Sequence, residues 1–131
     1  MNSVHDILRV DGVSLTGHGG ALILDNIHFA LRSSEKLAVI GPNGSGKSSL
    51  LRALIGETRP DSGGIYWRGR ALSEWPAAER ARSIAFLAQN DLPDLRLSVE
   101  DYVALGRLPH GERSATGKRI VDEAIGETGL A

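Results

Sequence analysis

One short stretch of the chain, residues 40–56, constrains the fold more than any other. Its sequence is IGPNGSGKSSLLRALIG, and the residues from Gly41 to Ser48 match the pattern G-x-x-x-x-G-K-[ST] at every fixed position. Residues 37–40, LAVI, are apolar throughout, which predicts a strand buried on both faces of a parallel sheet. Apolar residues then recur at helical spacing, and Gly56 stands where a left-handed cap ends a helix. The stretch therefore predicts a strand, a glycine-rich loop and a helix in succession.

The residue types in this loop predict a site for phosphate groups. Glycines allow backbone N–H groups to approach phosphate oxygens closely, and some of them must adopt a positive φ. The positive end of the following helix would attract an anion, and Lys47 supplies a mobile charge for the β- and γ-phosphates. The Ser48 hydroxyl is a hard oxygen ligand that suits magnesium. The alternative is an ordinary glycine-rich turn with a surface lysine, but the flanking strand and helix favour a phosphate loop.

Composition limits the classes of protein that remain. With 131 residues, 41% of them hydrophobic, the chain has room for one modest domain. Fifteen basic and sixteen acidic residues form no long run of either sign, which argues against a nucleic-acid or lipid surface. The absence of cysteine excludes disulfides and fits a reducing compartment. Neither a signal peptide nor an apolar run of the roughly 20 residues that span a bilayer is present, so we expect a soluble, cytoplasmic protein.

Alternating apolar and polar residues predict an antiparallel sheet in the first half of the chain. Residues 7–17 predict one edge strand or two short pieces, followed by a loop at residues 17–20. Residues 27–32 alternate as in a half-buried strand, and residues 64–70 predict a further short strand. A second buried strand of the parallel sheet is predicted at residues 84–88, IAFLA.

Helical patterns dominate the second half of the chain. Pro76 suits the first turn of a helix, because its missing N–H would have no partner there. Ser98 followed by Asp101 is typical of a capping box, and the helix that it begins is predicted to end at Gly106. Residues 107–117 predict a linker. The final helix carries apolar residues at positions 120, 121, 124 and 125 on one face.

Three segments together give the chain a specific resemblance. GPNGSGKSSLLRALIG, PDSGGIYWRG and IAFLAQN are similar, in order and spacing, to the first part of the ATP-binding subunit of an ATP-binding cassette (ABC) transporter. This implies an α/β P-loop NTPase fold of the ABC type, with an antiparallel β subdomain, a partial parallel sheet core and the start of a helical subdomain. Residues 1–89 would form the nucleotide-binding core with Walker A, and residues 90–131 the Q-loop exit and the beginning of the helical subdomain. The carboxy-terminal half of the family domain would be absent.

The resemblance also implies a site for ATP and Mg²⁺. Gln89 ends the predicted strand at 84–88, and the resemblance assigns it to the Q-loop as a magnesium ligand with Ser48; the alternative is a solvated loop glutamine. His18 takes the place of the tyrosine that stacks on adenine in the family, and an imidazole can stack with less area. The alternative is a histidine in a flexible, glycine-rich loop. Ser49 replaces a threonine and keeps the hydroxyl group. The implied nucleotide-binding residues are Gly41, Pro42, Asn43, Gly44, Ser45, Gly46, Lys47, Ser48, Ser49 and His18.

The segment SVEDYVALGRLPH resembles the equivalent region of importers for iron chelates, haem and cobalamin. An importer would imply two partners, a second ATP-binding subunit in a homodimer and a membrane permease that holds the protein at the inner face of the cell membrane. The family's signature sequence, Walker B carboxylates and switch histidine are not found, so no catalytic residue is assigned and we expect no ATP hydrolysis by this chain alone. Residues 21–25 and 120–123 each resemble a Walker B segment in part, and both are predicted to be scaffold.

Two rival interpretations remain open. One is a non-catalytic nucleotide-binding fragment or truncated gene product with no transport activity. The other is a small kinase or GTPase, which is disfavoured because neither an acceptor-binding lid nor a guanine-reading Asn-Lys-x-Asp motif is found.

Overall fold

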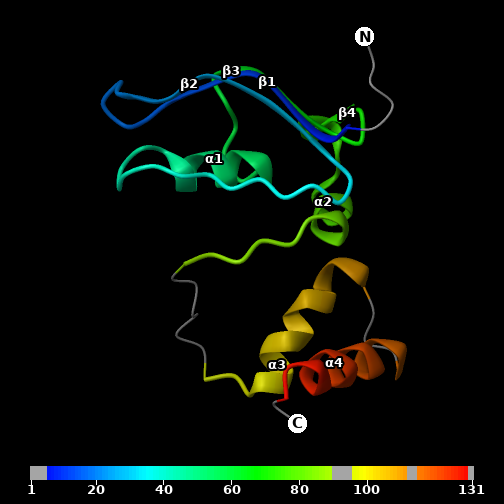
Figure 1. Ribbon diagram of the computed structural model, residues 1–131. Helices are drawn as coiled ribbons and strands as arrows, with labels where there is room; N and C mark the ends of the chain where they lie inside the picture. Colours follow the sequence, from blue (N-terminus) through cyan, green and yellow to red (C-terminus); the bar gives the residue numbers. More distant parts are fainter. Residues whose placement is uncertain (1–5, 90–95, 112–114, 130–131) are drawn as a thin grey trace. The chain divides into compact units, whose positions relative to one another are not determined.

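The computed structural model describes residues 6–89, 96–111 and 115–129 (Figure 1). The chain forms two compact units, with the boundary between Pro76 and Ala77. The first unit holds an antiparallel sheet and the glycine-rich loop, and the second is helical. The predicted division into a nucleotide-binding core and a helical subdomain at residue 89 stays a prediction, because it concerns the larger family domain.

The sheet of the first unit has four strands in the order β2-β1-β3-β4. Strands β1 (Asp6–Thr16) and β2 (Leu22–Arg32) form a long hairpin, and β3 (Ser62–Trp67) pairs with the other edge of β1 and with the short β4 (Arg70–Ala71). The predicted antiparallel sheet is therefore confirmed. The prediction of an edge strand or two short pieces at residues 7–17 was wrong, because β1 is one continuous strand with partners on both sides.

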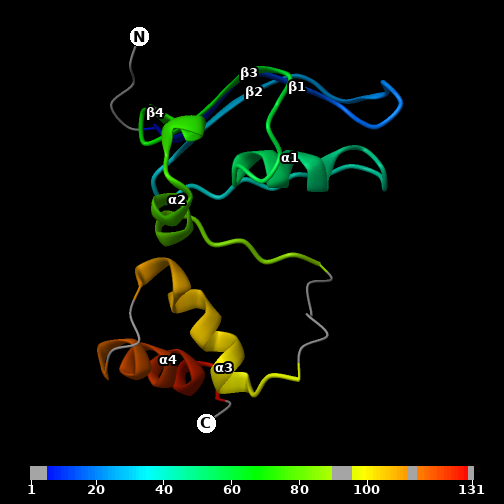
Figure 2. The same cartoon turned by 180° about the vertical axis from the view of Figure 1, so that it is seen from behind.

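The core of the first unit lies between the sheet and helix α1 (Lys47–Leu54), which lies under the sheet in Figures 1 and 2. Buried apolar side chains come from both: Val10, Val13, Leu15, Leu24 and Ile65 from the strands, and Leu50 and Ala53 from α1. The predicted cap of the helix is confirmed. Gly56 has a φ of 76° and its N–H donates to the Ala53 carbonyl at 3.0 Å. The 3₁₀ turn η1 (Leu72–Glu74) adds buried Leu72 to the core.

Two predicted strands, at residues 37–40 and 84–88, do not form. Neither segment has regular secondary structure, and the side chains of Ile40 and Leu87 are 91% and 94% exposed. A strand exists only where a neighbour accepts and donates its backbone hydrogen bonds, and the described sheet consists of β1 to β4 alone. The partial parallel core that the sequence predicts is therefore not assembled among the described residues.

The second unit consists of short helices, α2 (Ala77–Ser83), α3 (Val99–Ala104), the 3₁₀ segment η2 (Leu105–His110) and α4 (Ala115–Glu127). Their bounds correct one prediction: the helix does not end at Gly106 but continues through η2 to Gly111, whose φ is 68°. The first part of the predicted linker is therefore helical.

Two local predictions for the second unit are confirmed. The Ser98 hydroxyl caps α3, since it accepts the Asp101 N–H at 3.1 Å and donates to the Asp101 carboxylate at 2.6 Å. On α4, Val121 is buried and its predicted neighbours on the same face are half-buried. None of the helices within the described ranges is long and apolar enough to cross a membrane.

Candidate nucleotide-binding site

The glycine loop, residues 41–46, has the backbone conformation that its sequence predicts. Gly44 and Gly46 have φ values of 80° and 91°, in the left-handed region that favours glycine. Gly46 is also the N-cap residue of α1, and its carbonyl accepts the N–H of Leu50 at 2.8 Å. A Cβ at position 46 would lie 2.7 Å from the carbonyl oxygen of Ile23 on β2. Gly46 is therefore required both by its φ and by the close approach of a neighbouring backbone.

The loop delivers hydrogen-bond donors to one place, the amino-terminal end of α1. The N–H groups of Lys47, Ser48 and Ser49 occupy the first turn of the helix, where no intrahelical acceptor exists. Gly46 has no side chain that could cap them, and the first turn carries no acidic residue. These donors and the positive end of the helix dipole favour an anion.

Lys47 adds a full positive charge to this end of the helix. Its Nζ donates to the carbonyl oxygens of Gly41 and Pro42, both at 2.7 Å, and lies 3.4 Å from the Ser45 hydroxyl. The half-buried side chain thus folds back over the loop that precedes α1. A three-donor ammonium on a flexible stem can exchange a carbonyl partner for a phosphate oxygen with little movement.

This set of groups fits a polyphosphate better than it fits a free metal ion. Residues 41–49 contain no carboxylate. Across the described ranges, no cluster of three or more His, Cys, Asp or Glu side chains could hold a metal. Magnesium usually keeps several oxygen ligands from water and from substrate phosphates. The exposed Ser48 hydroxyl could therefore hold Mg²⁺ only together with phosphate oxygens.

His18 lies at the tip of the β1–β2 hairpin, in the loop predicted at residues 17–20. The loop is closed by hydrogen bonds from Gly17 N–H to Ala21 O at 2.8 Å and from Gly20 N–H to Gly17 O at 3.1 Å. In Figures 1 and 2 this tip and the glycine loop lie toward the same end of the first unit. The imidazole is exposed and no interaction of it is described, so its stacking on adenine stays a prediction.

Gln89 is exposed and follows the irregular segment 84–88. It belongs to the second unit, whereas Ser48 belongs to the first. A magnesium ion shared by these two side chains therefore stays a prediction. Of the two segments that resemble Walker B, one places Asp25 exposed on β2 and the other, residues 120–123, lies within α4; their role as scaffold stays a prediction.

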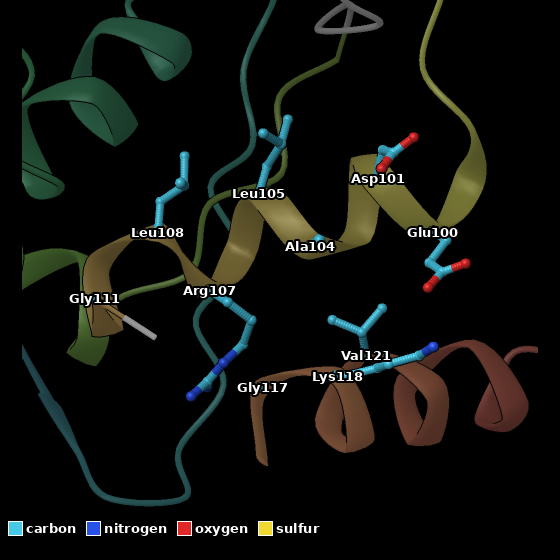
Figure 3. A pocket seen from close by; sticks show the side chains of 10 residues that line it. All are labelled: Glu100, Asp101, Ala104, Leu105, Arg107, Leu108, Gly111, Gly117, Lys118 and Val121. Atoms are coloured by element: carbon cyan, nitrogen blue, oxygen red, sulfur yellow. The ribbon is translucent and has the colours of Figure 1, made fainter. Parts of the chain in front are cut away.

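The second unit also contains a groove, between α3 with η2 on one side and α4 on the other (Figure 3). Glu100 and Lys118 lie near it, Arg107 reaches toward α4, and Val121 points toward α3. None of the predicted nucleotide-binding residues lines this groove. Its lining combines acidic and basic side chains, Glu100 and Asp101 with Arg107 and Lys118.

Two residues that contact the glycine loop or the β1–β2 hairpin, Ile23 and Asp61, were not predicted from the sequence. Ile23 places its carbonyl against Gly46, and its side chain lies where a Cβ on Gly17 would clash at 2.7 Å. The Asp61 carboxylate accepts the N–H of Thr16, 45 residues earlier in the chain, at 2.6 Å. Aspartate in a turn commonly accepts a nearby backbone N–H, which is the only signal the sequence gives.

The family follows from comparison with known proteins. A family model described as "ABC transporter" matches residues 24–130. The chain belongs to the ABC transporter family. The resemblance drawn from the sequence is therefore confirmed, including the P-loop NTPase fold of the ABC type.

Relatives in this family carry a more specific name. The hemin import ATP-binding protein HmuV of Pseudomonas entomophila is 44% identical over 119 residues, which are 91% of this chain and 46% of that protein. The protein of the same name from Pseudomonas aeruginosa is 40% identical over the same shares of the two chains. The chain thus spans about half the length of the curated relatives it matches.

Solved structures agree on the fold. The cbiO1 structure from Clostridium perfringens, described as part of the ABC transporter complex cbiONQ, matches with a TM-score of 0.78 and 26% identity. The match covers 96% of this chain and 51% of that one. A structure described as an ATP-binding subunit of an ABC transporter matches with a TM-score of 0.76 and 27% identity, over 95% and 51% of the two chains.

Proposed function

We propose that this chain binds Mg²⁺-ATP as part of the ATP-binding subunit of an importer. The observation that carries the proposal is the glycine loop, in which two left-handed glycines lead into the uncapped first turn of α1 and the Lys47 ammonium is hydrogen-bonded to the loop carbonyls. The relatives named as hemin import proteins support hemin as the cargo of the complete protein. A second ATP-binding subunit and a membrane permease would be its partners, and the permease would hold it at the inner face of the membrane.

Each residue of the site has a separate part in binding. The first N–H groups of α1 bind phosphate oxygens, and Lys47 neutralises charge on the β- and γ-phosphates. The Ser48 and Gln89 side chains hold the magnesium ion, which screens the charge of neighbouring phosphates when bound. His18 stacks on the adenine ring and gives the site its preference for a nucleotide over inorganic polyphosphate.

These residues would bind the phosphates of ATP in the ground state but would not accelerate hydrolysis. Hydrolysis needs a carboxylate that orients water and donors that act more strongly on the transition state. Within the described part of the chain, residues 41–49 contain no carboxylate and the first turn of α1 has no acidic side chain. The importer would obtain these groups from other parts of the complete domain and from its second subunit.

Substitution of Lys47 by alanine tests the binding proposal. Affinity for Mg²⁺-ATP and for Mg²⁺-tripolyphosphate should both fall about 10- to 100-fold, the usual worth of a charge-assisted hydrogen bond. Isothermal titration calorimetry measures both ligands, and Lys118→Ala, which removes an exposed lysine from α4, is the matched control. If Lys47→Ala binds both ligands as the parent chain does, the glycine loop is not the phosphate site.

Transport is tested on a protein extended to the full length of the relatives. We expect it to copurify with a permease and to drive ATP-dependent uptake of hemin into vesicles that contain that permease. Uptake of cobalamin or an iron chelate with no uptake of hemin would replace the cargo and leave the ATP site intact.

A further inference from the structure

Asp61 forms hydrogen bonds to the end of β1 with both its side chain and its backbone. Its Oδ2 accepts the N–H of Thr16 at 2.6 Å, and its own N–H donates to the carbonyl of Ser14 at 2.9 Å. Asp61 directly precedes β3, so it joins two strands at the point where their pairing ends.

The carboxylate replaces a strand partner that β1 lacks at this point. The last pair between β1 and β3 is Ser14 with Ser62. On the opposite side, Thr16 is still paired with Leu22 of β2. In the described sheet no β3 residue is paired with Thr16, and the Asp61 carboxylate accepts its N–H instead. The hydrogen bond therefore gives β1 a partner on the β3 side as far as Thr16, the last residue before the hairpin loop.

The hairpin loop at residues 17–20 directly follows the hydrogen bond between Thr16 and Asp61. Gly17 follows Thr16 directly, and the loop then carries His18 before β2 begins at Leu22. Gly19 and Gly20 both have a φ above 80°, so the loop itself has little steric restriction. Its orientation must come mainly from the two strand ends that hold it.

The same hairpin also contacts the glycine loop. The carbonyl of Ile23 on β2 lies against Gly46, and the Ile23 side chain lies against Gly17. A shift at the end of β1 would therefore change the position of the His18 loop relative to the phosphate-binding end of α1. The contact of Ile23 with Gly46 does not itself involve Asp61, so the glycine loop would keep its own conformation.

We infer that Asp61 is a positioning residue for the base-binding part of the nucleotide site. It holds Thr16, orients the hairpin loop and thereby places His18 for stacking on adenine. The inference rests on the proposed function, in which ATP occupies the glycine loop. Asp61 itself would contact neither the phosphates nor the base. Its substitution should therefore lower the affinity for nucleotides and leave the affinity for inorganic polyphosphate unchanged.

The test compares two ligands with two substitutions of Asp61 in the 131-residue chain. Asp61→Ala should lower the affinity for Mg²⁺-ATP about fivefold, because loss of one exposed hydrogen bond reduces the population of the binding-competent loop by that order. Affinity for Mg²⁺-tripolyphosphate should not change. Asp61→Asn keeps an acceptor oxygen and should restore most of the affinity for ATP. Asp25→Ala, which removes an exposed carboxylate from β2, should bind both ligands as the parent chain does.

A double-substitution cycle decides whether Asp61 acts through His18. In a His18→Gly background, Asp61→Ala should weaken ATP binding no further, because the stacking group is already absent. Additive losses, or equal losses for ATP and tripolyphosphate, would overturn the inference and give Asp61 a general role in the fold. Failure of the parent chain to bind tripolyphosphate would instead refute the proposed function. If the parent chain binds Mg²⁺-ATP and Mg²⁺-tripolyphosphate with equal affinity, the phosphate site stands but adenine contributes nothing to binding. That result would also overturn the inference about Asp61.

Discussion

Replacement of Gly46 by alanine should damage the first unit far more than the same replacement at Gly44. Both residues are in the glycine loop, and their φ values, 91° and 80°, are both in the left-handed region. Their surroundings differ. A Cβ on Gly44 would meet no atom within 4 Å, whereas a Cβ on Gly46 would lie 2.7 Å from the Ile23 carbonyl oxygen and 3.2 Å from two apolar side-chain carbons. The pair therefore separates the cost of backbone conformation from the cost of a steric clash.

The magnitudes follow from these two terms. An alanine in the left-handed region costs about 1 kcal/mol relative to glycine, and this cost is common to both variants. A clash with a fixed backbone atom forces a shift like that of an overpacked core, which typically costs about 1–3 kcal/mol. We therefore expect the free energy of unfolding to fall by about 1 kcal/mol for Gly44→Ala and by roughly 2–4 kcal/mol for Gly46→Ala. A small domain has only about 5–15 kcal/mol in total, so the second loss is large.

Tryptophan fluorescence is the appropriate measurement. The chain has two tryptophans, Trp67 and Trp75, and both lie in the first unit with the glycine loop. Urea titration without ligand reports the stability of this unit alone and avoids any direct effect of a new methyl group on phosphate binding. Equal destabilisation by the two substitutions would refute the close approach of Ile23 to Gly46. It would also remove the contact that links the hairpin to the glycine loop.

Three further predictions concern the base contact, a helix cap and turnover. His18→Tyr should keep or tighten ATP binding, while His18→Gly should weaken ATP binding much more than tripolyphosphate binding in calorimetry; equal losses would mean that His18 acts on the phosphates or the fold. Ser98→Ala should cost about 1 kcal/mol of local stability and speed hydrogen exchange at the Asp101 amide, which loses its acceptor; unchanged exchange would contradict the cap. The purified chain should release phosphate from ATP no faster than solution background, and turnover that Lys47→Ala abolishes would mean that a catalytic carboxylate was overlooked.

The features that the sequence predicted well are those whose cause is local. Gly56 caps α1 and Ser98 caps α3 because a few consecutive residues supply both the donor and the acceptor. The glycine loop is equally local, since the positive φ of Gly44 and Gly46 is a property of glycine itself. The alternation at residues 27–32 likewise predicted part of β2, and the glycine-rich turn at residues 17–20 was predicted from its composition.

The predicted strands at residues 37–40 and 84–88 failed for the opposite reason. A continuous apolar sequence indicates that a segment prefers burial. A strand also needs a hydrogen-bond partner for each of its backbone donors and acceptors. Neither segment is paired in the described sheet, and Ile40 and Leu87 are almost fully exposed. Such segments favour association with other chains, because they combine apolar side chains with unpaired backbone groups.

The nucleotide site shows the same distinction between chemistry and geometry. Lys47 and Ser48 could be proposed from the sequence because their functional groups would contact the ligand, and the chemistry of a phosphate ligand dictates the residue types. Asp61 and Ile23 are inferred to act only through the positions of other residues, which the strand order β2-β1-β3 brings near them. An aspartate in a turn and an isoleucine in a strand carry no sign of that role. Positioning residues of this kind are therefore found only when the pairing of the strands is known, and their substitution should alter selectivity between ligands rather than abolish binding.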